Sequence, residues 1–295
     1  MNPNDVLLAL PITTWQGPFD AHLQAAAVDA LESGHVLVLP QLPFRATNAE
    51  RDLLTPSILG GKRKNISLDP GARSVSNTAL DATGVARLAG MMERFAQDST
   101  RLVSALIPVY APELERARTS FRPAEIEGRA YSPRHDDRLL HVDAFPTRPM
   151  HGRRILRLFS NVAPDGAPRE WRVGEAFEEF ARAFLPRIRP ALPGSAVVQQ
   201  VLGLTKGRRG AYDHIMLGLH DAGKLDTAYQ TDGPKIAASF PAGCTWMCFT
   251  DQVLHAALSG HCALEQTFHL PIASMVHPER SPLRVLEKLA GRPLD

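Results

Sequence analysis

The run His141-Val142-Asp143 constrains what this chain can fold into more than any other feature of it. It lies within the apolar stretch 139–145, which is typical of a strand. In a strand, residues two apart share a face, so His141 and Asp143 can converge on one metal ion. Two imidazoles and one carboxylate form the facial triad of non-haem Fe(II) sites, which leaves positions open for a co-substrate and O₂. The alternative is a core histidine beside a turn aspartate.

Two other His-x-acid runs are weaker candidates. About one such match is expected by chance in a chain with 11 His and 31 acidic residues. His135-Asp136-Asp137 lies in a charged, proline-containing run that is typical of a solvated loop. His277-Pro278-Glu279 follows the last strand pattern. Only the middle run is embedded in apolar residues.

A third metal ligand has to come from a distant histidine. His255 has the best setting, because a strand pattern over 245–250 leads into it and Ser259-Gly260 then turns the chain. This order places it near the rim of a sheet. The other candidates are His214, His220, His261 and His269.

The apolar patterns predict a mainly β fold with flanking helices. We expect helices over 21–33, 84–107 and 175–185, a short strand over 36–40, and a long loop over 45–78. Further strands are predicted over 139–145, 155–162, 196–202, 215–219, 245–250 and 263–272. Short strands separated by turns favour an antiparallel barrel or jelly roll. We therefore expect one domain over 1–295, with a helical and loop layer over about 1–130 and a jelly-roll core over about 131–275.

Composition excludes several other classes. A net charge of +2 gives no argument for nucleic-acid binding. The cysteines, Cys244, Cys248 and Cys262, lack metal-finger spacing and an even count for a disulfide framework. The N-terminus lacks the basic region of a signal peptide, and no apolar run approaches the ~20 residues that span a bilayer. These features predict a cytoplasmic protein.

Several longer runs resemble the Kdo 3-hydroxylases. They cover 141–149, 152–161, 251–255 and 265–268, and the stretches 61–70 and 212–221 are also similar. The resemblance extends over about 55–272. It implies a double-stranded β-helix (cupin-like) core and an Fe(II)- and 2-oxoglutarate-dependent oxygenase. It implies hydroxylation, with O₂, of C3 of 3-deoxy-D-manno-oct-2-ulosonic acid (Kdo) in the lipid A inner core, and it makes His141, Asp143 and His255 the iron ligands.

The residue that anchors the far carboxylate of the co-substrate is not at the usual position in the sequence. Many 2-oxoglutarate enzymes place an Arg shortly after the distal His, but no basic residue occurs between His255 and Arg280. A desolvated carboxylate needs a charged partner, preferably a guanidinium. In the strand 155–162, Arg157 and Asn161 share one face, so we expect this pair to bind it, with Arg154 as second choice. Thr267 is a further candidate contact. The alternative is that Arg157 is a surface residue with a partly buried stem.

Cations are expected to hold the substrate, because Kdo carries a carboxylate and lipid A carries phosphates. The candidates are Lys62, Arg63 and Lys64, with Asn65, Ser67 and Arg148. The alternative is that this run of charges is a solvent-exposed surface that binds no ligand. A lipid-linked substrate would add peripheral contact with the inner membrane.

Two other functions remain open. The chain could be an oxygenase of the same chemistry that acts on another small molecule or a protein side chain. It could also be a non-catalytic jelly-roll module that binds an anionic glycan.

Overall fold

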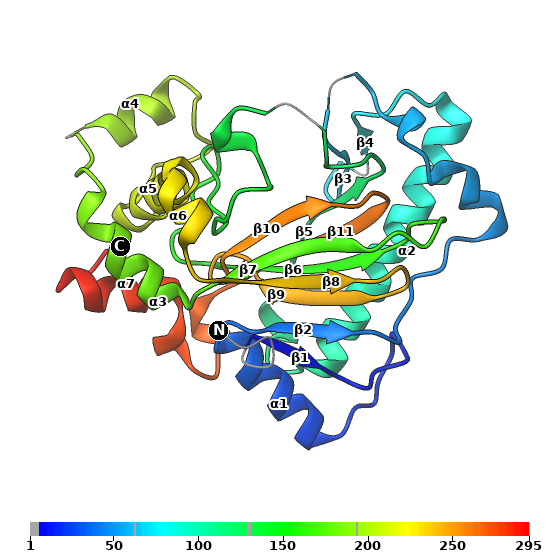
Figure 1. The fold of residues 1–295 in the computed structure, drawn as a ribbon, viewed down its shortest axis with the longest axis horizontal. Coiled ribbons are helices and arrows are strands. Elements are labelled where there is room, and N and C mark those ends of the chain that lie inside the picture. Colours follow the sequence, from blue (N-terminus) through cyan, green and yellow to red (C-terminus); the bar gives the residue numbers. More distant parts are fainter. Residues whose placement is uncertain (1–5, 62, 73, 129–130, 193, 295) are drawn as a thin grey trace.

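Two β-sheets face each other and form the centre of the molecule (Figure 1). The structure is a computed structural model that describes residues 6–61, 63–72, 74–128, 131–192 and 194–294. The larger sheet has eight strands in the order β1-β2-β9-β6-β11-β5-β3-β4, and the smaller has the order β10-β7-β8. Their bounds are β1 Leu7–Ala9, β2 Val36–Leu39, β3 Ile66–Asp69, β4 Ser74–Ser76, β5 Glu115–Arg122, β6 Arg154–Asn161, β7 Arg169–Gly174, β8 Lys235–Phe240, β9 Thr245–Phe249, β10 His255–Ser259 and β11 Ala263–Leu270.

Aromatic side chains pack between the two sheets. Phe159 of β6 and Trp246 of β9 stack with ring centroids 5.3 Å apart, and Trp246 stacks on Phe240 of β8 at 4.1 Å. Trp171 of β7 meets Phe159 edge-on at 5.0 Å. Strands from both sheets thus point large apolar groups into one interior, as the alternation of side chains in a jelly roll requires.

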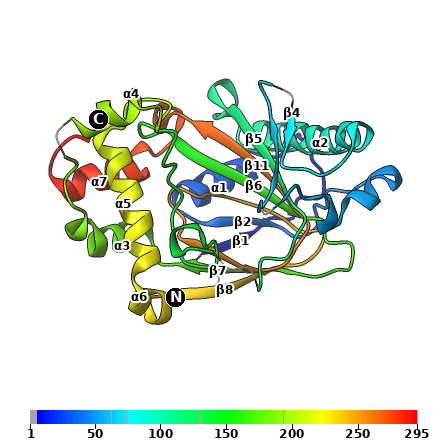
Figure 2. The same cartoon turned by 90° about the horizontal axis from the view of Figure 1, so that it is seen from above.

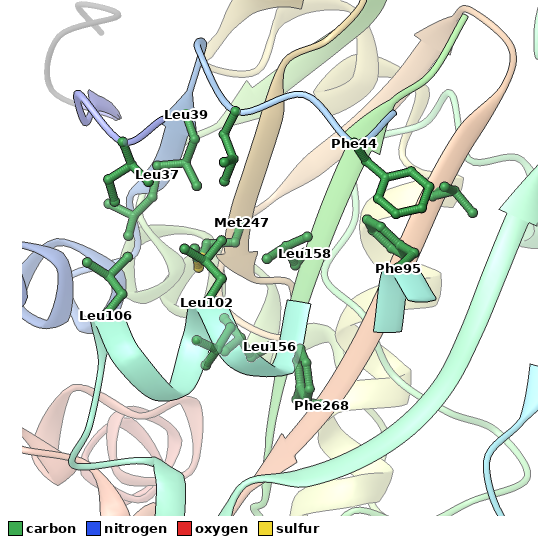
Figure 3. Packing of buried hydrophobic residues seen from close by; sticks show 14 of the residues in the cluster. Leu37, Leu39, Phe44, Phe95, Leu102, Leu106, Leu156, Leu158, Met247 and Phe268 are labelled. Carbon is green, nitrogen blue, oxygen red and sulfur yellow. The ribbon is translucent and has the colours of Figure 1, made fainter. Parts of the chain in front are cut away.

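Helices α1 (Ala21–Glu32) and α2 (Ala82–Leu106) are associated with the larger sheet. Asp81 caps α2 by accepting a hydrogen bond from the Gly84 N–H. The buried side of α2 packs on the sheet, and its Leu102 lies near Leu156 and Met247 (Figure 3). This packing fixes the orientation of β6 and β9 on their outer face, so that the opposite face of each strand can line the interior.

A second group of helices lies at one end of the sheets (Figure 2). Their bounds are α3 Phe177–Phe184, α4 Ser195–Val201, α5 Ala211–Leu225, α6 Thr227–Asp232 and α7 Pro282–Ala290. Phe180 and Leu219 are fully buried in a cluster that also holds Val142 and Leu254. Val142 and Leu254 are the chain neighbours of His141 and His255, so the helices hold the segments that carry both histidines. No helix in the described ranges is long and apolar enough to cross a membrane.

The sheet-rich fold with flanking helices is confirmed, as are the predicted helices over 21–33, 84–107 and 175–185 and the strands over 36–40, 155–162, 245–250 and 263–272, within a few residues at their ends. The strand over 139–145 is wrong, because only His141 forms a bridge there. The strands over 196–202 and 215–219 are also wrong, because both are helical. The spacing of Tyr212, Ile215, Met216 and Leu219 is helical, which the short apolar run conceals.

The N-terminal half contributes more strands than the patterns indicate. The segment 45–78 is not one long loop, because it contains β3, β4 and the 3₁₀ turns Asn48–Leu53 and Pro56–Ile58. β5 pairs with β11, so residues before 130 belong to the same sheet as the later strands. The division expected near residue 130 therefore does not coincide with a boundary between layers.

Arg154 is a fully buried structural cation. Its Nε donates to Asp251 at 2.7 Å, its Nη2 donates to Gln252 at 2.7 Å, and its guanidinium lies 3.9 Å from the Phe249 ring centroid. Both Arg154 and Asp251 are at most 2% exposed in their side chains. Removing one partner of such a pair leaves the other as an uncompensated buried charge.

We therefore predict that Arg154→Met lowers the free energy of unfolding by roughly 3–5 kcal/mol in guanidinium denaturation. The double variant Arg154→Met, Asp251→Leu should recover most of that loss, because it removes both charges. A single variant that unfolds like the wild type but no longer binds 2-oxoglutarate would contradict the structural role and support the anchoring role.

Candidate functional site

A pair of backbone hydrogen bonds joins the two segments that carry the metal-ligand candidates. The N–H of His141 donates to the carbonyl of His255 at 3.1 Å, and the N–H of His255 donates to the carbonyl of His141 at 2.9 Å. The N–H of Asp143 donates to the Thr250 carbonyl at 2.8 Å. Gln230 of α6 hydrogen-bonds to both backbone groups of Leu140. The 141–143 segment is thus extended without belonging to a full strand.

Both imidazoles keep Nε2 available for a shared metal ion. Nδ1 of His141 lies 2.7 Å from the Leu139 carbonyl, and Nδ1 of His255 lies 2.9 Å from the Val253 carbonyl. Each contact favours a proton on Nδ1, which leaves Nε2 free as a metal ligand. Nε2 of His141 is 3.9 Å from Oδ1 of Asp143. One ligand atom from each of the three residues lies within 4.8 Å of the others, so this donor set fits a facial-triad iron.

The charge states suit metal binding. Burial lowers the pKa of both His141 and His255, so both rings are neutral near neutral pH. Burial alone would raise the pKa of Asp143, but the charge of Arg157 is the largest opposing effect and holds this pKa below its usual value. Arg157 Nη2 is 3.1 Å from Asp143 Oδ2, and its Nη1 is 3.1 Å from Glu265 Oε1. Arg157 therefore orients the carboxylate that completes the cluster.

The cluster lines a cavity of about 410 Å³ between the sheets. Its inner wall comes from strands of both sheets and combines the apolar residues Phe159, Trp171, Ala257 and Ala263 with the charged residues Arg122, Arg157, Arg169 and Glu265. Its outer wall comes from loops and α5 and is polar, with Lys64, Arg134, His135, His220, Asp221 and Lys224. The ligand cluster thus shares the cavity with a wall of buried strand residues and a polar wall of loop and α5 residues.

A second cavity of about 450 Å³ adjoins the first. The two share the lining residues Arg122, Phe145, Pro146, Arg157 and Glu265. The second carries four further cations, Arg116, Arg118, Arg148 and Lys206, and the acids Asp69 and Glu115. The site is therefore a two-part hollow with an excess of positive charge.

The four residues expected to bind the co-substrate lie in different places. Arg157 lines both cavities, and Thr267, its register partner on β11, lines the second. Arg154 lines neither cavity and is engaged with Asp251. Asn161 also lines neither, because its Nδ2 donates to the carbonyls of Ala167 and Phe240, both at 2.9 Å. Side-chain contacts hold Arg154 and backbone carbonyls hold Asn161, so neither residue faces the two cavities.

Two arginines that the sequence interpretation missed lie on the inner wall. Arg169 is 3% exposed and donates to the Gly260 carbonyl at 2.7 Å; in the described part of the chain it forms no salt bridge. Burial, and then the charge of Arg122, lowers the pKa of Arg169 to about 10. Arg122 pairs with Asp137 at 2.9 Å and Glu265 at 3.2 Å. The alternation of Arg169, Trp171 and Val173 was the available signal, because it places all three on one face of a strand.

The residues expected to hold the substrate are only partly brought together. Lys64 lines the first cavity, where its Nζ contacts Asp137 at 3.0 Å and also donates to the His135 carbonyl. Asn65 and Arg148 line the second cavity. Arg63 is exposed and lines neither, whereas Ser67 is buried within β3 and also lines neither. Lys62 lies outside the described residues.

The other histidine candidates are accounted for elsewhere. His214 contacts the carbonyl of Arg189, and His261 lies near Asp165. His269 is beside Glu115. His220 is nearest to the cluster, with its ring centroid 5.4 Å from that of His141, but its Nδ1 contacts Asp221 at 2.9 Å.

Facing sheets around an inward-directed cluster of two histidines and one carboxylate define the class of non-haem Fe(II) oxygenases. The family model for 3-deoxy-D-manno-oct-2-ulosonic acid (Kdo) hydroxylase matches residues 14–293. The chain therefore belongs to the Kdo hydroxylase family.

Solved structures of one family member are very similar. The Kdo hydroxylase KdoO, a non-haem Fe(II) α-ketoglutarate-dependent dioxygenase, is 44% identical in its complex with α-ketoglutarate and Fe(III), with a TM-score of 0.95 over 98% of this chain and 97% of that chain. Its succinate and Fe(III) complex gives 44% identity and a TM-score of 0.94 over the same shares. Its cobalt(II) complex gives 45% and 0.95, again over the same shares. The comparison with curated proteins gave no match.

We predict that His141→Ala, Asp143→Ala and His255→Ala each abolish stoichiometric Co(II) binding, followed by the ligand-field absorption of the metal. Each change removes one of the three protein ligands. The matched control is His220→Ala, which removes a nearby ring of the same cavity and should leave Co(II) binding intact. Retained Co(II) binding by His255→Ala, with loss in His220→Ala, would exchange the roles of these two histidines.

Proposed function

We propose that this chain is an Fe(II)- and 2-oxoglutarate-dependent oxygenase that hydroxylates C3 of Kdo in the lipid A inner core, with iron held by His141, Asp143 and His255. The observation that carries the proposal is the convergence of these three side chains in the main cavity of a Kdo hydroxylase family member. Bound iron supplies the activation of O₂, coupled to oxidative decarboxylation of 2-oxoglutarate to succinate and CO₂. The protein's own residues bind, orient and separate the reactants.

The inner end of the cavity suits the co-substrate. A dicarboxylate that reaches the metal with one end has to place its other carboxylate in the enclosed part of the cavity, where a charged partner is required. Phe159, Trp171 and Ala257 can cover the short carbon chain between the two ends. We assign the anchor to Arg169, because it is buried without an ion-pair partner in the described residues, and Arg122 lies near enough to lower its pKa.

Arg157 is a weaker candidate for the anchor. Its two terminal nitrogens already contact Asp143 and Glu265, so a third carboxylate would have to displace one of them. We therefore propose that Arg157 is a positioning residue that keeps Asp143 ionised and directed at the metal.

The outer rim suits the anionic sugar. Lys64, Arg134 and Lys224 line the part of the cavity that is formed by loops and α5. The second cavity adds Arg148 beside Asn65. We propose that the Kdo carboxylate lies against the rim cations and that neighbouring anionic groups of the lipid occupy the second cavity. This arrangement places the substrate and the co-substrate against different groups of cations.

Arg169→Ala is predicted to weaken 2-oxoglutarate binding by at least about tenfold, the equivalent of 1.4 kcal/mol. Arg169→Lys should restore only part of the affinity, because an ammonium cannot reproduce the bidentate fork. The measurement is a titration of 2-oxoglutarate into the anaerobic Fe(II) protein, followed by the metal-to-ligand charge-transfer band.

Arg172→Ala is the matched control, because Arg172 lies on the same strand but is exposed on its other face. It should bind 2-oxoglutarate like the wild type. Normal binding by Arg169→Ala together with weak binding by Arg157→Ala would return the anchor to Arg157.

The proposed reaction predicts succinate formation that is coupled one to one to a mass gain of one oxygen in the Kdo unit. The assay combines the Fe(II) protein, 2-oxoglutarate and O₂ with Kdo-bearing lipid A, and mass spectrometry follows the sugar. Succinate formed without oxygen in Kdo would indicate another substrate of the same chemistry. No succinate under any condition would indicate a non-catalytic glycan-binding module.

A further inference from the structure

Most of the exposed large apolar side chains gather in one short segment around α4. Of the nine such side chains in the described residues, six lie between 192 and 204, namely Leu192, Val197, Val198, Val201, Leu202 and Leu204. Val201 is 79% exposed and Leu192 is 77% exposed. Scattered exposed apolar residues are ordinary, but a concentrated patch of them marks an interaction surface.

The orientation of α4 accounts for this exposure. Ala196 and Gln199, three residues apart, line a cavity shared with His214, Leu217 and Ala222 of α5. The small and polar side of α4 therefore faces the protein, and its valines face outward. Figure 1 shows α4 at the edge of the molecule, beyond α5. This amphipathicity is inverted relative to a helix that packs on a core.

Basic residues flank the apolar segment. Between Glu179 and Asp213 the chain has no acidic residue and six basic ones, Arg182, Arg187, Arg189, Lys206, Arg208 and Arg209. Arg182 and Arg187 are paired with Glu178 and Asp226. Arg189, Lys206 and Arg208 form no salt bridge in the described part of the chain. The whole protein has a net charge of only +2, so this concentration is local.

We propose that residues 192 and 194–209 form a membrane-docking surface that binds the interface of an anionic phospholipid bilayer. Apolar side chains enter the boundary between headgroups and acyl chains, and neighbouring cations contact the anionic headgroups. A second copy of the chain is a poor occupant, because self-association would bring two cationic surfaces together. A zwitterionic surface would leave the basic residues without partners.

The docking surface adjoins the mouth of the proposed active site. Leu217 and Asp221 line both the catalytic cavity and the cavity beneath α4. The N–H of Lys206 donates to the Thr147 carbonyl at 2.8 Å, and Arg209 donates to the Pro146 carbonyl at 2.6 Å. Lys206 also lines the second cavity. Docking would therefore bring the rim close to the headgroup layer, where the sugar of a lipid-linked substrate lies; this last step rests on the proposed function.

The test is flotation of the full-length protein with vesicles of phosphatidylglycerol and phosphatidylethanolamine, compared with vesicles of phosphatidylcholine alone. The wild type should bind the anionic vesicles and bind less at high salt. Val201→Gln, Leu202→Gln, Leu204→Gln should lower the partition coefficient by about tenfold or more. Arg189→Gln, Arg208→Gln should lower it on anionic vesicles only.

A matched control removes as many exposed apolar side chains elsewhere. Val109, Leu225 and Val276 are 45–50% exposed and lie outside the docking surface. Val109→Gln, Leu225→Gln, Val276→Gln should bind vesicles like the wild type. Equal losses in the control and α4 variants, or no binding by the wild type, would overturn the proposal. The proposal would also be overturned if the wild type is a dimer in sedimentation velocity and binds no vesicles, while the variant Val201→Gln, Leu202→Gln, Leu204→Gln is a monomer.

An activity assay separates this proposal from the proposed function. With a Kdo-bearing saccharide that lacks acyl chains, the variant Val201→Gln, Leu202→Gln, Leu204→Gln should form succinate at the wild-type rate. With the same sugar in vesicle-embedded lipid A, it should be slower than the wild type, mainly through a higher apparent KM. If the wild type turns over neither substrate, the proposed function is refuted. The vesicle-binding result would still decide whether the docking surface exists.

Discussion

The reciprocal hydrogen bonds between His141 and His255 are the interaction on which the site depends. They join two segments more than a hundred residues apart, and in such a pair the side chains of opposed residues lie on the same face. Burial of Val142 and Leu254 against the helices supports this bridge from the other side. Since the imidazoles are held by backbone contacts and packing, the ligand geometry can exist before a metal arrives, and little ordering is left for binding to require.

Alternating charges extend from the cavity rim to this cluster. Lys64 contacts Asp137, Asp137 contacts Arg122, Arg122 contacts Glu265, and Glu265 contacts Arg157, which reaches Asp143. This chain has equal numbers of positive and negative groups, so each buried charge in it has a partner. Arg169 lies outside it and adds one buried cation that forms no salt bridge in the described residues. Together with a divalent metal, that surplus positive charge favours a dianionic co-substrate at the inner end.

The metal-ligand candidates could be identified from sequence because their signal is local. The apolar setting of His141 and the turn after His255 are visible in short windows, and the longer runs around them carry the family resemblance. The inner-wall cations could not be identified in the same way. Arg122 and Arg169 lie on strands of different sheets and come together only where the two sheets face each other. The alternation around Arg169 indicates which face of its strand it shares, but no local pattern indicates what lies opposite that face. The extent of a single domain over 1–295 stays a prediction.

The segment around α4 shows how an error in sequence interpretation can be informative. Its apolar run 196–202 predicts a strand, but periodicity alone does not separate a short strand from a helix. In the structure the run is helical and its large side chains face outward. A segment that breaks the rule of apolar burial needs a compensating interaction outside the chain. The basic residues on either side specify what kind of surface can supply it.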